Sequence, residues 1–279
     1  MIIWLASYPK SGNTWVRSFI NSLIFTEDGS SNINHLKIGQ FPNREHFINL
    51  ISNLDTKNNL KELSKNWIIA QNIINLSVGK KFFKTHHSLC KIYGNNFTDL
   101  KNTDAVIHIV RDPRNVITSL KNHYQKKNYA EALDFLFDEN RVIYDEDNTG
   151  ITTFVGSWKS NYNSWKKFPK NYFLIKYENL IENPEREFLK LSEFLIKLLN
   201  FKISKNKIKK AIISNNFENL QLVEKKEGFR ESSNMKYAGK GKNFFNLGPN
   251  NKWEKLLDND TKIRIENYFK DEMQELGYL

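Results

Sequence analysis

The chain has 279 residues, of which 39% are hydrophobic and 13% aromatic, so it can bury a substantial core in one or two domains. Forty-two Lys and Arg against 31 Asp and Glu give a formal charge of +11, which favours anionic partners such as nucleotides, nucleic acid or an acidic membrane. The basic residues are scattered, with small groups at 205–210 and 236–242, so a solvated basic surface is favoured over a dedicated nucleic-acid-binding tail.

The single cysteine, Cys90, excludes an intramolecular disulfide and a Cys-rich zinc site. We expect it to be a small buried apolar residue. The apolar stretch 2–6 is too short for a membrane span and lacks the basic segment and length of a secretory signal. The sequence therefore predicts a cytoplasmic, reduced protein.

Apolar patterns of two periods alternate along the chain. A continuous apolar run at 2–6 predicts a buried strand, and Trp15, Phe19 and Leu23 at four-residue spacing predict an amphipathic helix after it. The same pattern returns as a strand at 105–110 and a helix at 115–124. Further elements are expected as strands at 81–85 and 172–176, a helix begun by Asn183 and Pro184 that buries Phe188, Leu191, Leu195 and Leu198, and a last helix from about Asp260 that buries Ile265, Phe269 and Met273.

Strands that alternate with helices predict an α/β fold, a mostly parallel sheet flanked by helices. No repeat or low-complexity linker divides the chain, so we expect one domain over residues 1–279. The polar or irregular stretches near 27–78, 128–168 and 224–250 are assigned to helices and loops around the site.

Residues 7–15, SYPKSGNTW, lie at the first strand-to-helix junction. In an open parallel sheet, ligands bind where strands end and helices begin, and a helix N-terminus offers amide donors to an anion. Gly12 permits close backbone approach and Lys10 adds a positive charge, while Ser11, Asn13 and Thr14 add polar side chains. The junction therefore predicts a phosphate site; the alternative is a surface turn with a solvated lysine. The lysine precedes the glycine, unlike the nucleotide triphosphatase loop.

This stretch closely resembles the phosphosulfate loop of the cytosolic-type sulfotransferase family, Tyr-Pro-Lys-Ser-Gly-x-Thr-Trp, with Asn13 at the variable position. The segment IVRDPRNVITS resembles the family's 3′-phosphate segment and implies that Arg111 and Ser119 bind that phosphate. Arginine presents a permanently charged, planar fork to phosphate oxygens. The alternative is a local ion pair between Arg111 and Asp112.

The segment FFKTHHSL resembles the family's Lys-Thr-His motif, matched by Lys84, Thr85 and His86. This register implies that His86 is the catalytic base, although His87 stands beside it. Alternation along a strand favours one of the two, because adjacent residues point to opposite faces.

Three later segments carry the resemblance to about residue 278. They imply that Tyr177 contacts the nucleotide and that Phe217 stacks near adenine with Trp15, whereas a core role is the alternative for each aromatic ring. The C-terminal motif keeps Gly248 and Trp253. Its two expected cations are replaced by Asn246 and Leu247, so either Lys240 and Lys242 substitute for them or nucleotide binding is weaker.

The resemblance implies a P-loop-like sulfotransferase that moves a sulfuryl group from 3′-phosphoadenosine 5′-phosphosulfate (PAPS) to a hydroxyl or amine, without a metal. Lys10 and Lys84 would stabilise charge around the transferred group while His86 accepts the acceptor's proton. The other predicted contacts to the nucleotide are Ser11, Gly12, Asn13, Thr14, Trp15, Arg111, Ser119, Tyr177, Phe217 and Gly248.

The acceptor is predicted only as a small molecule, peptide or glycan, and the oligomeric state is unassigned. Four aromatic residues are candidates for an apolar acceptor pocket or for the core: Phe41, Phe47, Tyr129 and Phe135. Two other functions remain open: a P-loop-like small-molecule kinase, with Asp112 as its candidate magnesium ligand, and a non-enzymatic binder of polyanions or nucleic acid.

Overall fold

A computed structural model describes residues 1–279 except 31, 53, 55–58, 145–149 and 233–242. The chain forms two compact units, each assembled from three stretches. Unit 1 contains Met1–Tyr8, Ile38–Ile109 and Asp138–Leu174, and unit 2 contains Pro9–Lys37, Val110–Phe137 and Ile175–Leu279. The prediction of one domain over residues 1–279 stays a prediction.

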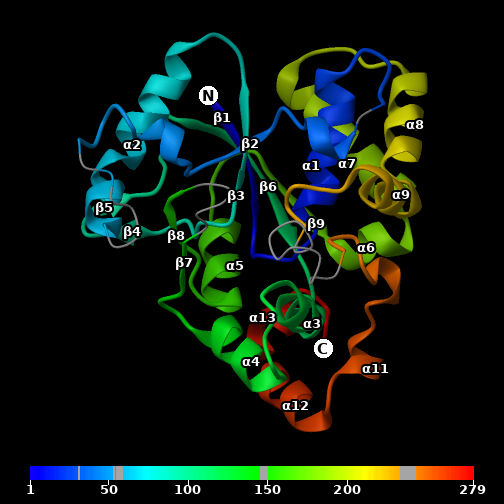
Figure 1. Ribbon diagram of the computed structural model, residues 1–279. Helices are drawn as coiled ribbons and strands as arrows, with labels where there is room; N and C mark the ends of the chain where they lie inside the picture. Colours follow the sequence, from blue (N-terminus) through cyan, green and yellow to red (C-terminus); the bar gives the residue numbers. More distant parts are fainter. Residues whose placement is uncertain (31, 53, 55–58, 145–149, 233–242) are drawn as a thin grey trace. The chain divides into compact units, whose positions relative to one another are not determined.

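Unit 1 holds the sheets (Figure 1). Its elements are β1 (Ile2–Ser7), β2 (Gly39–Gln40), a 3-10 turn η2 (Arg44–His46), α2 (Leu60–Leu76), β3 (Lys81–Thr85), β4 (Lys91–Ile92), β5 (Asn95–Asn96), β6 (Thr103–Val110), β7 (Val142–Tyr144), β8 (Thr152–Phe154), α5 (Trp158–Lys166) and β9 (Tyr172–Lys176). Val110 at the end of β6 and the last two residues of β9 belong to unit 2.

The main sheet has the strand order β2-β3-β1-β6-β9. β1 pairs in parallel with both β3 and β6, and β2 pairs in parallel with β3. Every residue of β1 and β6 is buried, as expected for central strands that are covered on both faces. The predicted α/β class with a mostly parallel sheet is confirmed.

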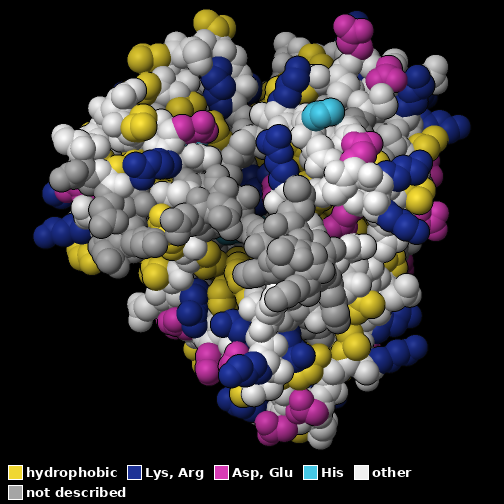
Figure 2. All heavy atoms as spheres, viewed as in Figure 1, with side chains coloured by type: hydrophobic (Ala, Val, Ile, Leu, Met, Phe, Trp, Pro, Cys, Tyr) yellow, Lys and Arg dark blue, Asp and Glu magenta, His cyan; other side chains and the backbone are white. Residues whose placement is uncertain are grey.

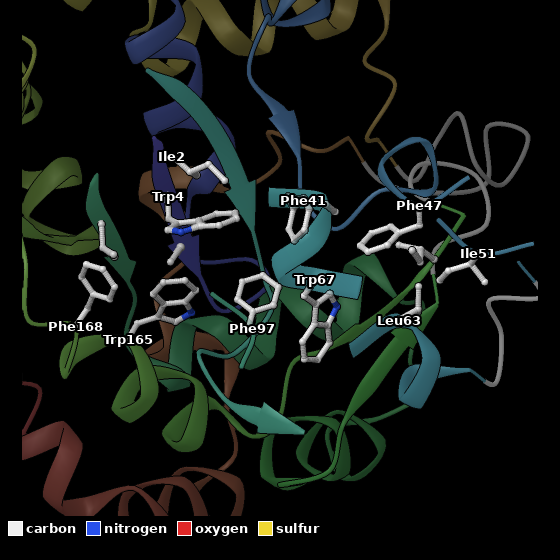
Figure 3. Packing of buried hydrophobic residues seen from close by; sticks show 14 residues of the cluster. Ile2, Trp4, Phe41, Phe47, Ile51, Leu63, Trp67, Phe97, Trp165 and Phe168 are labelled. Carbon is white, nitrogen blue, oxygen red and sulfur yellow. The ribbon is translucent and has the colours of Figure 1, made fainter. Parts of the chain in front are cut away.

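One face of this sheet carries the core of unit 1, shown in Figure 3. Trp4 of β1 packs against Phe41, Phe97 and Trp165, with ring centroids 5.5–6.3 Å apart, and its Nε1 donates to Thr103 Oγ1 at 2.9 Å. Trp67 of α2 joins the same cluster. Phe41 and Phe47 are fully buried there, so these two acceptor-pocket candidates are core residues.

Unit 2 is helical. Its elements are α1 (Asn13–Phe25), η1 (Ile33–His35), α3 (Pro113–His123), α4 (Tyr129–Phe137), α6 (Tyr177–Glu182), α7 (Pro184–Leu199), α8 (Lys205–Ser214), α9 (Phe217–Glu227), η3 (Gly248–Asn250), α11 (Trp253–Leu256), α12 (Asn259–Tyr268) and α13 (Lys270–Glu275). Helix α1 packs against α7 through stacked rings of Phe19 and Phe188, whose centroids are 4.0 Å apart.

The predicted start of α7 agrees with the structure, whereas the predicted C-terminal helix does not. The helix start at Asn183 and Pro184 is confirmed, because the Asn183 side chain accepts from the Arg186 amide. The prediction of a single C-terminal helix is wrong: the helix is divided at Phe269 into α12 and α13, both of which bury apolar residues of the predicted stripe.

Cys90 is only half-buried, although burial raises the pKa of its thiol to about 12. Among the described residues, no helix is long and apolar enough to cross a membrane.

Candidate active site

The loop that follows β1 enters unit 2 and shapes the start of α1. Lys10 adopts a left-handed conformation (φ 66°), and Gly12, the N-cap of α1, has φ 98°. Gly12 provides no side-chain acceptor for the first-turn amides of α1. The Ser11 hydroxyl beside it is buried and has no hydrogen-bond partner among the described residues. This helix start is therefore built with donors but no capping acceptor, as an anion site requires.

Arg111 and Tyr177 meet this loop. The Nη1 of Arg111 donates to the carbonyl oxygen of Lys10 at 3.0 Å, and its guanidinium lies 4.3 Å from the centroid of the Tyr177 ring. Tyr177 in turn packs over Gly12, where a Cβ atom would lie 2.4 Å from Tyr177 Cδ2. Three segments far apart in the sequence thus bring Lys10, Gly12, Arg111 and Tyr177 together. Burial raises the pKa of Tyr177, so its hydroxyl is neutral at physiological pH.

Aromatic side chains extend from this centre. The Trp15 ring lies edge-on to Tyr177 and Phe217, at centroid distances of 6.0 and 6.4 Å, and its Nε1 donates to Asn215 O at 2.6 Å. Phe217 is half-buried and covers Gly248, where a Cβ atom would lie 2.1 Å from the ring. Trp15, Tyr177, Phe217 and Gly248 therefore form one cluster in unit 2, next to the loop.

Residues 244–246, in the C-terminal motif that lacks its two expected cations, are hydrogen-bonded to α9. Gln221 Nε2 donates to the carbonyls of Phe245 and Asn246 at 2.7 and 2.9 Å, and the buried Glu224 carboxylate accepts from the amides of Phe244 and Phe245. Lys10 Nζ lies 4.1 Å from the centroid of the Phe244 ring. The two candidate substitute cations, Lys240 and Lys242, lie outside the described residues.

Helix α3 begins directly after Arg111. Asp112 is its N-cap, and both carboxylate oxygens of Asp112 accept from the Arg114 guanidinium. Asp112, the candidate magnesium ligand of the kinase alternative, is thus engaged by its own helix. Ser119 lies half-buried two turns into α3, and its neighbour Thr118 donates to Asn251 Oδ1 at 2.7 Å.

Two adjacent histidines of unit 1 have different environments. The parallel register pairs Ala6 with Thr85, so the next residues, Ser7 and His86, lie side by side. The Nδ1 of His86 is 2.8 Å from the Ser7 carbonyl oxygen, which can only accept. In neutral His86 the proton is therefore on Nδ1, and Nε2 carries the lone pair that takes up a proton.

His87 points into the core instead. It is fully buried, its ring stacks on Phe97 at 4.0 Å, and Trp67 lies edge-on to it. Burial lowers the pKa of His87 to about 3, so it stays neutral. Lys84, which is on β3, precedes the two histidines in the sequence and is 8% exposed. Lys84 and His86 belong to unit 1, whereas Lys10 belongs to unit 2.

Sequence reasoning missed residues that support or modify these groups. Asn161 Nδ2 donates to the carbonyl of His86 and to Ser88 Oγ, both at 3.1 Å, which fixes the turn that follows β3. In unit 2, Arg17 and Thr14 both donate to Glu231. The only available signal was the spacing of Thr14 and Arg17 on one helix face. No cluster of three or more His, Cys, Asp or Glu able to hold a metal occurs among the described residues.

Comparison with known proteins extends over nearly the whole chain. A family model described as a sulfotransferase domain matches residues 2–277. Cytosolic sulfotransferase 10 of Arabidopsis thaliana is 22% identical over 99% of this chain and 79% of its own length. Flavonol 4′-sulfotransferase of Flaveria chlorifolia is 25% identical over 98% of this chain and 75% of its own length.

Two solved structures share the fold. The crystal structure of mouse sulfotransferase SULT7A1 complexed with PAP has a TM-score of 0.60 at 17% identity, covering 97% of this chain and 83% of that one. That of retinol dehydratase in complex with retinol and PAP has a TM-score of 0.59 at 17% identity, covering 98% and 81%.

Proposed function

The chain belongs to the sulfotransferase domain family, and on that premise we propose that it transfers a sulfuryl group from PAPS to a hydroxyl or amine of its acceptor, with His86 as the general base. Structural relatives carry PAP, the 3′-phosphoadenosine 5′-phosphate that remains after transfer. The observation that carries the proposal is the contact of Arg111 with the Lys10–Gly12 loop beneath Tyr177.

The residues present fit such a nucleotide. Within the described part of the chain, the buried Ser11 hydroxyl lacks a hydrogen-bond partner and the helix start at Gly12 has no side-chain cap. Both features suit a phosphate group. Arg111, which precedes α3, and Ser119 on α3 would hold the 3′-phosphate, while the half-buried Phe217 and the buried Trp15 would flank the base. PAPS supplies an activated sulfuryl group on a phosphate leaving group.

Each chain residue then has a role in charge or proton transfer. Lys10 and the first-turn amides of α1 stabilise negative charge on the leaving phosphate oxygen, because preformed donors need no reorganisation during reaction. Lys84, with its charge held in a buried position, stabilises the sulfuryl oxygens. His86, whose Nδ1 is held by Ser7, accepts the acceptor's proton at Nε2.

The two alternative functions are less well supported. The kinase alternative requires a carboxylate for magnesium, and Asp112 is engaged by Arg114. A polyanion binder would present a continuous basic face, whereas on the face shown in Figure 2 the Lys and Arg side chains are interspersed with Asp and Glu.

A thermal-shift series tests the class of function. We expect PAP to raise the melting temperature at concentrations where ATP and a mixed-sequence oligonucleotide do not. An equal shift by ATP would favour the kinase, and a salt-sensitive shift by the oligonucleotide alone would favour the polyanion binder. Incubation with sulfate-labelled PAPS and a panel of phenols, alcohols, amines, sugars and peptides then identifies the acceptor class; no labelled product with any of them would count against the enzyme.

A further inference from the structure

A carboxylate lies against the first turn of α1, inside the proposed phosphate site. Glu231, on the turn after α9, accepts from the Thr14 hydroxyl at 3.3 Å through Oε2 and from the Arg17 guanidinium through Oε1. Thr14 and Arg17 are three residues apart on α1, so they share one helix face. Side chains on a helix lean toward its N-terminus, which brings the Arg17 guanidinium to the turn that begins at Gly12.

Arg17 is an unusual group to place there. Its side chain is only 6% exposed, and its Nε is buried with no hydrogen-bond partner in the residues that the structure describes. A buried guanidinium needs an anion beside it, because an unpaired buried charge is costly. Glu231 provides that anion here, while its own side chain remains 24% exposed. A phosphate group would satisfy Thr14 and Arg17 as well as a carboxylate does.

From this geometry we infer that Arg17 is a phosphate-binding residue of the co-substrate site, and that Glu231 is its exchangeable counter-ion. The inference rests on the proposed function. In the absence of nucleotide, the Glu231 carboxylate occupies the place of a phosphate oxygen at Thr14 and Arg17. A phosphate bound at the start of α1 would lie beside that carboxylate, so like-charge repulsion favours exchange of one anion for the other.

The inference predicts opposite effects for the two halves of the pair. Arg17→Met removes a charged donor and should weaken PAP binding about 10- to 100-fold. Glu231→Gln removes the competing charge and should tighten PAP binding about 3- to 10-fold. A purely structural ion pair would instead weaken PAP binding, or leave it unchanged, in both variants.

Isothermal titration with three nucleotides locates the effect. Arg17→Met should weaken PAP and adenosine 5′-phosphate to the same degree and leave adenosine 3′-phosphate unchanged, since the start of α1 would hold the 5′-phosphate. Matched controls in the same unit are Arg186→Met, which removes an exposed guanidinium that pairs with Glu187, and Glu227→Gln, which removes one carboxylate from the end of α9. Both controls should bind PAP like the wild type.

The outcomes are separable. If wild-type protein fails to bind PAP, the proposed function fails. If it binds PAP but the two variants change affinity in the same direction, or Arg17→Met weakens all three nucleotides alike, only the inference is overturned. Should Arg17→Met not fold, judged by circular dichroism, Arg17→Lys and Glu231→Gln give the same test: the lysine variant should bind PAP more weakly, and the glutamine variant more tightly, than the wild type.

Discussion

At the scale of single residues, two adjacent histidines directly after β3 have different chemistry because their side chains lie in different surroundings. His86 is held by the carbonyl at the end of β1, whereas His87 stacks on Phe97 in the core. The sequence motif and strand alternation favoured His86. The structure adds the reason that His87 is a poor base: burial lowers its pKa to about 3.

Replacing each histidine in turn tests this assignment. His86→Ala should reduce sulfuryl transfer about 10²- to 10⁴-fold, the usual loss when a general base is removed. Its PAP affinity should stay within about twofold of wild type, because the imidazole acts on the acceptor. His87→Phe, which keeps a ring against Phe97, is the control and should retain transfer. Normal turnover in His86→Ala together with a large loss in His87→Phe would reverse the assignment.

Gly12 is a second position where one atom matters. In Gly12→Ala the new Cβ would lie 2.4 Å from Tyr177 Cδ2, and the residue would have to keep φ at 98°. We expect PAP affinity to fall about 10-fold or more, because Tyr177 must move from its place over the loop. Gly94→Ala is the matched control: φ there is 84°, but nothing lies within 4 Å of its Cβ position. Equal PAP affinity in both variants would show that the loop tolerates a shifted Tyr177.

At the scale of elements, long patterns were predictable and short ones were not. The buried strands β1 and β6 follow from apolar runs, and the capped helix α7 follows from Asn183 with Pro184. The partly buried strand β3 was also predicted. The pairs β4–β5 and β7–β8 have strands of only two or three residues, too short to show a period. The break at Phe269 was missed because the apolar spacing continues across it.

In the candidate site too, some features could be predicted from local sequence patterns and others could not. The loop at 7–15 and the position of Arg111 could be predicted from the sequence, because each lies where a buried strand ends. The contact of Tyr177 with Gly12 and the pairing of Arg17 with Glu231 join residues 165 and 214 positions apart. Such contacts depend on how helices pack, which a single sequence does not encode in any local pattern.

At the scale of the whole molecule, buried histidines make stability depend on pH. Burial lowers the pKa of His46 to about 4 and those of His87 and His108 to about 3, from the usual 6.5. Below pH 6.5 the unfolded chain binds protons that these folded rings do not. Their contribution to stability is therefore complete above pH 6.5 and is lost progressively as pH falls toward 4 and then 3.

Urea unfolding at several pH values checks this expectation. Between pH 6.5 and 5, each histidine should lower the free energy of unfolding by up to about 1.4 kcal/mol per pH unit. His87→Phe removes one of the three and should reduce the slope accordingly. Substitution of the exposed His35, which lies on a 3-10 turn of unit 2, is the control. Identical slopes for wild type and His87→Phe would mean that His87 is accessible to protons in the folded protein.

The proposed function requires that the start of α1 and the Arg111 guanidinium bind two phosphates of the same nucleotide. The direct measurement is the affinity of wild type and Arg111→Ala for PAP and for adenosine 5′-phosphate, with Arg264→Ala on the exposed face of α12 as control. We predict that Arg111→Ala weakens PAP about 10- to 100-fold and adenosine 5′-phosphate less than about threefold, because only PAP carries a 3′-phosphate. Equal weakening of both nucleotides, or of neither, would contradict the claim.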